Sequence, residues 1–578
     1  MTGSDYDVYV NNMLAVNYEA AIDQTARFDG LYPGMIWPYN HGGVAGNHDA
    51  RPLHGTQIHV TREATLNTGM TFAEFNWHGK DVWIPKDGII PPTLTAKIQL
   101  TNQLATLMKP EIDYPYFKAV PQTKGRNHIP LGYITKNRLA GQKVLVTAQA
   151  IRSDNAEFTQ FYVNGVSFWV SAQVVSNLGQ PLPTLFIGSN PVIRANTKSK
   201  SSTVTIRQAT GESDLAQIKF SVQGNYTKDF QRKNFEFELY ADFEQATPKP
   251  IQFGTWQPRS KFSLRGDYTD QTHSRNGAGY ALWREILATE QVYPTTIRDQ
   301  EMLGTIQTQP VNVFFDGVNY GIYSLSSYLD AASLKLDPHN KDEIMLLALN
   351  GYAHNKDLAF ANPTARLNDS DFGVMSAHTA ADQQLFTNTN RLMKFINTAD
   401  DQEFHENAKD YFDPLNLIDY ILFVGAIDAF DNVAHNTTVF TYDGQHWLFS
   451  LIDLDISFDI DADGKLLSNP HPVFNKIQSP LFKRIFACFP SEVKARWQEL
   501  RHSVLSEDHM IDTYRQTMAK IGDTNFAIDQ SIWHSPTGRT SSLEHVTTFV
   551  QQHLPKSDDT IAKSYHRNLL QGFDIDFK

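Results

Sequence analysis

The C-terminal half of the chain carries aspartates and an asparagine in an order that phosphoryl transfer can use. Asp431 and Asn436 lie five positions apart, and Asp453 follows after a predicted β-hairpin. The reaction needs an aspartate that orients the attacking hydroxyl or accepts its proton, an asparagine on one metal ion, and an aspartate that links the metal to the phosphates. We therefore expect Asp431 to be the catalytic base and Asn436 and Asp453 to bind metal. Asp428 competes for the role of base, and Asp455 is a candidate second metal ligand.

The elements around these residues are predicted to hold them together. An Asp-Pro pair at 413–414 suits the N-cap and first position of a helix, and the apolar residues between 417 and 424 give that helix a buried face. The runs 437–442 and 447–452, joined by an Asp-Gly turn, predict the hairpin. A helix end and a hairpin with polar loops would explain the elements, but not the coincidence of the three polar residues.

A second group of residues could hold phosphates. Gly224 and Thr227 lie in a turn between two predicted strands, and Lys233 begins the next strand. Backbone N–H groups of such a turn can face phosphates, and the lysine can reach the same anion. A glycine turn followed by a surface lysine also occurs by chance in many β proteins. On a helix predicted at 275–289, Glu285 is the candidate to hold the lysine in place, and an exposed helix-face glutamate is the alternative.

Two further polar features allow more than one interpretation. Residues 459–464 imitate the opening of a calcium loop, but its twelfth position would be Pro470 instead of a bidentate glutamate, so a solvated turn competes with a calcium site. His435 could contact substrate or be a hydrogen-bonded structural histidine.

The first 180 residues contain an internal duplication. The segment 53–64 reads against 139–150 with an offset of 86, and the same offset relates Trp83 to Trp169. An offset that holds over about thirty residues indicates a duplication. Each copy consists of short alternating runs separated by Gly, Asn and Asp, which is typical of small twisted β-barrels. For both tryptophans we favour a place in the barrel core over contact with a ligand.

Composition limits the classes of function. A chain of 578 residues is too long for one hydrophobic core, so several domains are expected. The net charge of −13 argues against nucleic acid as a partner. Cys488 is the one cysteine, which excludes an intrachain disulfide and a cysteine metal cluster. No apolar run predicts a transmembrane helix, and no signal peptide is visible. Because recognisable repeat structure begins within the first twenty residues, we expect a trimmed or truncated N-terminus.

The two copies resemble the GW module, a bacterial SH3-like repeat, over about residues 10–93 and 95–176. This resemblance implies non-covalent attachment to the wall of a Gram-positive cell, through teichoic acid or another wall polymer. The Gly-Trp pair that names the module is replaced by Val82-Trp83 and Phe168-Trp169. The 14 Lys and Arg against 14 Asp and Glu over residues 1–180 predict weak attraction for a polyanion.

The rest of the chain resembles the CotH kinase family of atypical protein kinases, from about Leu182 to at least Phe482. The resemblance is carried by the segments 224–235, 265–285, 311–323 and 411–420, and by His435-Asn436 with Asp453-Leu-Asp455. It implies transfer of the γ-phosphate of ATP to serine or threonine of protein substrates, with Mg²⁺ or Mn²⁺.

On matching positions, the resemblance implies that Lys233, and less surely Arg232, hold phosphates, that Asp431 is the base, and that Asn436 and Asp453 bind the metal. The sequence departs from the family at Ser327, where an acidic residue is usual, and it lacks the glycine-rich loop of ordinary kinases.

The expected fold is therefore multidomain. Two small SH3-like β-barrels at 1–93 and 94–178 precede an α+β, protein-kinase-like domain at 179–578, with a β-rich lobe at about 183–330 and a larger helical lobe at about 331–578. Apolar spacing predicts helices at 482–488, 492–505 and 508–521. The expected location is extracellular or at the cell surface. A catalytically silent pseudokinase that binds the wall, and a calcium-stabilised scaffold, are the alternatives.

Overall fold

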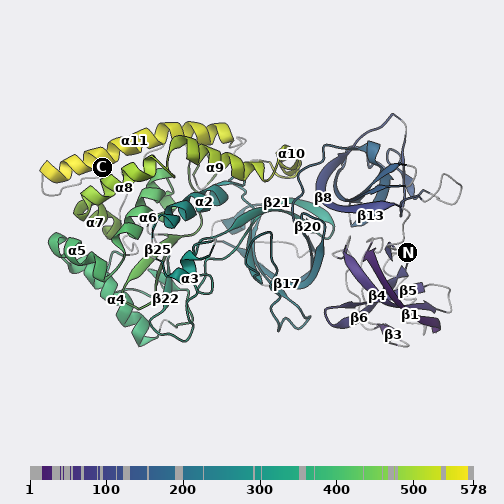
Figure 1. Ribbon diagram of the computed structural model, residues 1–578, viewed down its shortest axis with the longest axis horizontal. Coiled ribbons are helices and arrows are strands. Elements are labelled where there is room, and N and C mark those ends of the chain that lie inside the picture. The colour runs from purple at the N-terminus through teal and green to yellow at the C-terminus, as the bar shows by residue number, and fades with distance from the viewer. Residues whose placement is uncertain are drawn as a thin grey trace. The chain divides into compact units, whose positions relative to one another are not determined.

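The computed structural model describes residues 16–570 with the exception of 29–38, 41–42, 45–52, 54–55, 67–70, 87–88, 91–95, 112, 122–129, 153–154, 164, 189–199, 225–226, 291–292, 301, 350–359, 370, 380, 434, 459, 462, 467–473, 475–478 and 535–541. The chain divides into two compact units. The β-rich unit comprises Met1–Gly266, Gln309–Leu325 and Lys520–His534, and the helical unit comprises Asp267–Thr308, Ser326–Ala519 and Ser535–Lys578. The segment 520–534 therefore belongs to the β-rich unit although the chain has already built most of the helical one (Figure 1).

The β-rich unit begins with two sheets of the same topology. The strands of the first copy are β1 (Val16–Phe28), β4 (Gln57–Leu66), β5 (Thr71–Trp77), β6 (Lys80–Pro85) and β7 (Ile89–Ile90), and those of the second are β8 (Lys97–Leu107), β11 (Lys143–Ile151), β12 (Glu157–Val163), β13 (Val166–Ser171) and β14 (Val175–Ser176). Their strand orders, β6-β5-β4-β1-β7 and β13-β12-β11-β8-β14, correspond one to one. The last four strands of each copy begin 86 residues apart, at 57 and 143, 71 and 157, 80 and 166, and 89 and 175. The predicted duplication is confirmed.

Short additional strands accompany these sheets: β2 (Tyr39–Asn40), β3 (Gly43–Val44), β9 (Pro115–Tyr116) and β10 (Gly132–Tyr133). Trp83 and Trp169 are both buried, at 2% and 0% exposure. Trp169 packs in a cluster with Val120 and Phe158. Both tryptophans are therefore buried, as predicted, but Trp169 packs in a cluster apart from the main apolar core of its repeat.

A closed barrel follows the second copy. Its strands are β15 (Thr184–Ile187), β16 (Lys200–Arg207), β17 (Ser213–Gln223), β18 (Asn234–Tyr240), β19 (Lys261–Arg265), β20 (Thr308–Phe315) and β21 (Val318–Ser326), in the order β15-β16-β17-β18-β19-β21-β20. A parallel pairing of β15 with β20 closes the ring. Alternating apolar residues such as Ile218, Phe237 and Val313 fill its interior, as the period-2 pattern of the strands requires.

The helical unit is built around a four-stranded sheet. The sheet has the order β23-β22-β24-β25, from β22 (Ile344–Ala348), β23 (Phe372–Val374), β24 (Thr437–Thr441) and β25 (Trp447–Leu451). Its helices are α2 (Arg275–Ala288), α3 (Thr295–Arg298), α4 (Gln383–Thr398), α5 (Asp401–Asn407), α6 (Pro414–Ala426), α7 (Pro480–Cys488), α8 (Pro490–Arg501), α9 (Glu507–Ala519) and α11 (Leu543–Leu570). Helix α6 packs on β25, and α11 packs on α8 and α9 (Figure 1).

The local signals for these elements hold. Asp413 caps α6, because its carboxylate accepts a hydrogen bond from the Asn416 N–H at 2.8 Å, and Pro414 occupies the first turn. The predicted hairpin is β24–β25, with Thr437 paired to Leu451. The three helices predicted after 480 are α7, α8 and α9. Among the described residues, no helix combines the length and the apolar character needed to cross a membrane.

Candidate functional site

The segment between α6 and β24 brings two predicted site residues into contact. Asp431 lies in a short 3₁₀ turn, Phe430–Asn432, and is 9% exposed. The side-chain nitrogen of Asn436 donates a hydrogen bond to Asp431 Oδ2 at 3.0 Å. This bond uses the nitrogen of the amide. The amide oxygen, which is the atom that a hard cation binds, is not part of it.

The hairpin brings Asp453 to the same segment. The Ile452 N–H donates to the Asn436 carbonyl at 3.1 Å. The buried Asn432 side chain donates to the Ile452 carbonyl at 2.8 Å. Tyr420 of α6 donates its hydroxyl to the Asn432 carbonyl at 2.8 Å and so ties the segment to the helix. Asp453 therefore follows directly on a residue that is hydrogen-bonded to both Asn432 and Asn436.

Three residues of this region have left-handed backbones. The φ angles are +51° at Asp428, +52° at Asn436 and +57° at Asp453. Non-glycine residues adopt this conformation rarely, at some cost in free energy, and such residues gather at functional sites. These φ angles could not be predicted from the sequence, because asparagine and aspartate are also ordinary turn residues.

Helix α2 supports the backbone at Asp453. The Asp453 N–H donates to the Tyr280 hydroxyl at 2.8 Å, and the Leu454 N–H donates to Asn276 Oδ1 at 2.8 Å. Leu454 is fully buried and lies against Gly279, where an added methyl group would overlap it. Both polar contacts come from one face of α2, so this helix fixes the backbone from which the Asp453 side chain extends.

A buried ion pair anchors the start of α2. The Asp270 carboxylate accepts hydrogen bonds from the Arg275 side chain, from the Thr272 hydroxyl and from backbone N–H groups. Burial acts to raise the pKa of Asp270, but Arg275 and these donors outweigh it and leave the pKa below its usual value. Arg275 also donates to the Ser457 carbonyl at 3.1 Å. The loop after Asp453 is thus held at both ends by α2.

The donor atoms present suit a magnesium ion that takes some of its ligands from the protein and others from phosphates. Asp453, Asp455 and Asn436 supply hard oxygen atoms, which Mg²⁺ prefers, and Mg²⁺ commonly takes one or two protein carboxylates together with phosphates and water. Within the part of the chain that the structure describes, no three His, Cys, Asp or Glu side chains are grouped to hold a metal by themselves. Asn436, Asp453 and Asp455 are therefore candidates to bind a metal that takes its other ligands from outside the protein.

The suggested calcium loop gains no support. Asp459 and Pro470 lie outside the described residues. Asp461 accepts hydrogen bonds from the N–H groups of Asp463 and Lys465, at 3.0 and 2.9 Å, and the Lys465 ammonium pairs with Asp463 at 3.1 Å. These contacts are those of a solvated turn. His435 Nδ1 lies 2.8 Å from the Leu349 carbonyl, as expected of a hydrogen-bonded structural histidine.

The candidate phosphate-binding residues belong to the β-rich unit. Gly224 has φ +107°, and a side chain there would overlap Thr227, so the turn needs glycine. Lys233 is 8% exposed, and its ammonium donates to the Lys228 carbonyl at 2.6 Å. The neighbouring Asn234 donates to Thr227 Oγ1 at 3.4 Å, which links the start of β18 to the turn.

Arg232 is placed differently from the prediction. Its guanidinium is 3% exposed and forms two hydrogen bonds with Asp529, at 3.0 and 2.9 Å, and a third with the Ile322 carbonyl. Asp529 lies on α10 (Asp523–Ile532), almost three hundred residues later in the chain. A guanidinium that is buried and paired in this way is not available to bind phosphate. This assignment is corrected, and the ion pair could not be read from local sequence.

Glu285 is also placed differently from the prediction. Its carboxylate is 43% exposed and lies 2.5 Å from Nε2 of His509 on α9. The alternative of a helix-face glutamate describes it better, because its partner is a histidine of the neighbouring helix. Ser327, which replaces an acidic residue of the family pattern, is buried, and its hydroxyl accepts a hydrogen bond from the Gln307 N–H at 2.9 Å.

The sequence did not reveal a buried charged cluster behind the site. Asp419 of α6 binds Arg496 of α8 through two hydrogen bonds of 2.7 Å, and Arg496 donates to Thr289 Oγ1 at 2.6 Å. Glu290 is 4% exposed in this cluster. Burial, together with the nearby Asp419, raises the pKa of Glu290 to about 11, so this carboxyl is protonated at neutral pH. The burial of Glu290 could not be predicted from the sequence, because a glutamate directly after a helix is usually exposed.

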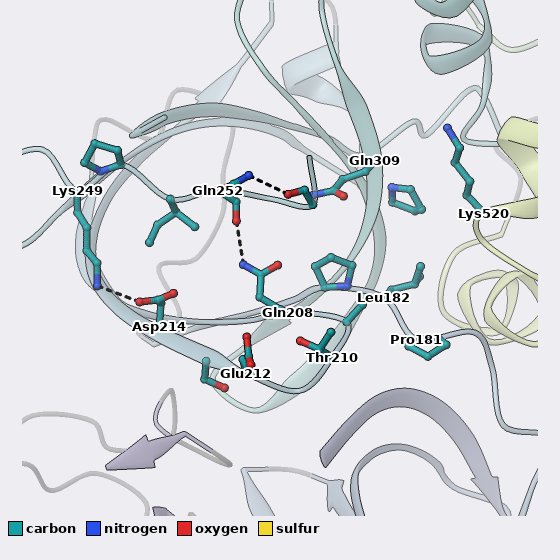
Figure 2. A pocket seen from close by; sticks show the side chains of 17 residues that line it. Pro181, Leu182, Gln208, Thr210, Glu212, Asp214, Lys249, Gln252, Gln309 and Lys520 are labelled. Carbon is teal, nitrogen blue, oxygen red and sulfur yellow. Dashed lines mark hydrogen bonds and ion pairs between the residues drawn. The ribbon is translucent and has the colours of Figure 1, made fainter. Parts of the chain in front are cut away.

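An open pocket of about 880 Å³ lies at one end of the barrel (Figure 2). Several of the polar side chains that line it form hydrogen bonds or ion pairs with other residues of the barrel. Gln208 donates to the Gln252 carbonyl at 3.1 Å, and the Lys249 ammonium lies 3.5 Å from Asp214 and donates to the Leu215 carbonyl at 2.6 Å. Among the residues that the structure describes, no aromatic side chain and none of the predicted phosphate-binding residues lines the pocket. We therefore do not assign the nucleotide to it.

Comparison with known proteins places both parts of the chain. The model of the CotH kinase protein family matches residues 220–556, and that of the GW (Gly-Tryp) dipeptide domain matches residues 12–89 and 99–176. No curated protein sequence matches the chain. A crystal structure of a candidate autolysin from Listeria monocytogenes aligns with 43% of this chain and 97% of its own, at 12% identity and a TM-score of 0.13, which is too low to indicate a shared fold.

Proposed function

Because the chain belongs to the CotH kinase protein family, we propose that it is an atypical protein kinase that transfers the γ-phosphate of ATP to serine, or threonine, of protein substrates. The observation that carries this proposal is the contact of Asp431 with Asn436, together with the hydrogen bond from the N–H of Ile452, the residue before Asp453, to the Asn436 carbonyl. These are the residue types that phosphoryl transfer requires, and they come from separate elements of the unit.

In the proposed reaction, Asp431 orients the serine hydroxyl and accepts its proton as the hydroxyl oxygen bonds to the γ-phosphorus. The bond from that phosphorus to the β–γ bridging oxygen breaks, and ADP leaves. The Asn436 side chain holds Asp431 Oδ2 through its amide nitrogen, so the carboxylate keeps one orientation. Asp431 is preferred to Asp428 as the base, because Asn436 contacts Asp431 directly.

Asn436 and Asp453 would hold Mg²⁺ or Mn²⁺, with Asp455 as a further ligand. When bound, the metal neutralises charge on the phosphates and orients them for in-line transfer. Tyr280 and Asn276 hold the backbone at 453–454 and so preset the position of the Asp453 carboxylate. Lys233, near the Gly224–Thr227 turn, is proposed to bind phosphate oxygens in place of its present carbonyl partner.

The two GW domains are proposed to keep the enzyme at the cell surface, through teichoic acid or another wall polymer. The 14 Lys and Arg against 14 Asp and Glu over residues 1–180 favour a domain surface of mixed charge over a strongly cationic one. A surface-bound kinase would act on neighbouring proteins outside the cell. The fold of each repeat is proposed to be an SH3-like barrel, and that of residues 179–578 to be related to protein kinases.

Phosphate incorporation from labelled ATP tests the proposal. The wild-type chain is expected to label itself or a serine-rich peptide with Mg²⁺ or Mn²⁺, whereas Asp431→Ala and Asp453→Ala, shown to be folded by circular dichroism, are expected to lose at least a hundredfold in rate. Asp461→Ala, in the solvated turn, serves as control. A wild-type chain that neither labels nor binds ATP would leave a catalytically silent wall-binding protein as the better account.

A further inference from the structure

We propose that Asp529 of α10 is a positioning residue for phosphate binding. It acts by holding Arg232, and thereby fixes the neighbouring Lys233 at the start of β18. This inference rests on the proposed kinase function and adds to it a residue from a distant segment of the chain. All the residues concerned belong to the β-rich unit.

The contact between Asp529 and Arg232 is specific. Both carboxylate oxygens of Asp529 accept hydrogen bonds from the guanidinium, at 2.9 and 3.0 Å, and Oδ1 also accepts one from the Ile322 N–H at 2.7 Å. The side chains are 3% and 5% exposed. Two charges taken out of water are tolerated when they pair with each other and when their remaining donors and acceptors are satisfied. Such a pair restricts each partner to one position.

Aromatic rings and a glycine surround the ion pair of Arg232 and Asp529. The guanidinium lies over the rings of Tyr323 and Trp533, with centroid distances of 5.0 and 5.6 Å. The Trp533 indole donates to the Tyr320 carbonyl at 2.7 Å and fixes the end of α10. Gly321 has φ +98°, and a side chain there would overlap Asp529 and Trp533. The absence of a side chain at Gly321 thus leaves room for Asp529 and Trp533.

The link from Arg232 to Lys233 is the backbone itself. Arg232 Cγ and the Lys233 carbonyl both lie against Gly266, where an added methyl group would crowd them at 2.9 and 3.0 Å. Asn234 accepts a hydrogen bond from the Gly266 N–H at 2.7 Å. The chain from 232 to 234 is therefore held both by Gly266 and, through Arg232, by Asp529. The Lys233 ammonium has a neutral carbonyl as its described partner, which a phosphate oxygen can replace.

The test measures ATP affinity directly, by titration of the full chain with a fluorescent ATP analogue and competition with ATP or adenosine. Asp529→Asn keeps the size of the side chain but removes its charge. We expect the dissociation constant for ATP to rise about tenfold and that for adenosine to change less than twofold, because the effect reaches only the phosphates. Asp523→Asn, exposed at the start of the same helix, is the matched control and should leave both constants unchanged.

A double variant separates positioning from general stability. In a Lys233→Ala background, Asp529→Asn should add no further loss of ATP affinity, because its effect passes through Lys233. Equal weakening of ATP and adenosine, or additive losses in the double variant, would overturn the inference. If Asp529→Asn does not fold, Arg232→Lys is the second variant. It keeps the positive charge beside Asp529 but cannot form the two parallel hydrogen bonds, and we expect a smaller loss of affinity that is again selective for ATP over adenosine. A wild-type chain that binds no ATP would instead refute the proposed function, and this inference with it.

Discussion

At the scale of single residues, the candidate site depends on polar groups that hold strained backbone in place. Asp428, Asn436 and Asp453 have left-handed φ angles, and hydrogen bonds from neighbouring elements compensate for this at Asn436 and Asp453. Preset backbone lowers the cost of organising ligands when a metal and phosphates bind. The role of a residue here is therefore decided by its neighbours as much as by its type.

The Tyr280 hydroxyl tests this view. Tyr280→Phe removes the acceptor of the Asp453 N–H, and we expect the Mg²⁺ concentration for half-maximal phosphate transfer to rise about fivefold, equivalent to about 1 kcal/mol. Tyr442→Phe removes a comparable hydrogen bond, to the Leu334 carbonyl at 2.9 Å, and is the matched control. It should lower the melting temperature without changing the Mg²⁺ requirement. An equal change in both variants would argue against a special role for Tyr280.

The buried Glu290 predicts a dependence of stability on pH. Its pKa is raised in the folded protein to about 11, mainly by burial, so between about pH 5 and 11 the folded chain keeps a proton that the unfolded chain releases. The contribution of Glu290 to stability is full below its unfolded pKa and is lost as pH rises. The free energy of unfolding of Glu290→Gln relative to wild type should therefore increase by about 1.4 kcal/mol per pH unit from pH 6 to 9.

Urea denaturation at several pH values measures this difference. Glu406→Gln, at an exposed position of α5, is the control and should run parallel to wild type. Parallel curves for Glu290→Gln as well would mean that Glu290 is ionised in the folded protein.

At the scale of elements, helix α6 leads into the segment that carries Asp431, and its packing is tight. A methyl group added at Gly425 would overlap the ring of Phe474. Although alanine normally favours a helix over glycine, we expect Gly425→Ala to destabilise the protein by about 1–3 kcal/mol. The change should also slow phosphate transfer, because Asp431 follows α6 closely. Thermal unfolding and labelling rates measure both effects.

A double variant tests whether the overlap with Phe474 causes the loss of stability in Gly425→Ala. Gly425→Ala combined with Phe474→Leu removes the overlap and should recover at least half of the lost stability. If the double variant is less stable than either single variant, the overlap with Phe474 is not the reason for the loss.

At the scale of the whole molecule, the second repeat shares buried polar contacts with the barrel. Arg207 of β16 is fully buried and donates to the carbonyls of Thr101 and Thr147, at 3.0 and 2.5 Å. Asn102 donates to the Leu182 carbonyl at 2.5 Å and to Thr184 Oγ1 at 2.8 Å. Leu104 and Tyr162 of the repeat pack with Phe186 and Phe314 of the barrel.

These contacts predict different outcomes for two truncations. A chain that begins at residue 96 should fold and keep the labelling activity of the full chain while losing part of its wall binding. A chain that begins at residue 180 should aggregate or unfold non-cooperatively, because it exposes Arg207 and Phe314. Size-exclusion chromatography and calorimetry compare them. A stable, active chain from residue 180 would show that the second repeat is dispensable for folding.

The sequence by itself determined the features that depend on neighbours along the chain. The strand and helix periodicities, the Asp413 cap, the hairpin before Asp453 and the offset of 86 between the repeats all follow from local pattern. The spacing of Asp431 and Asn436 indicated a shared role in phosphoryl transfer, whereas the hydrogen bond between their side chains is visible only in the structure.

Only the tertiary structure decided the partners of Arg232, Glu285 and Glu290. Arg232 meets Asp529, and Glu285 meets His509, across almost three hundred and more than two hundred positions of the chain. The charge of a side chain is visible in sequence, but its burial and its partner depend on which distant segments pack together. Because a buried charge must be paired or neutralised, that packing determines whether an arginine binds a phosphate or an aspartate, and whether a glutamate is ionised.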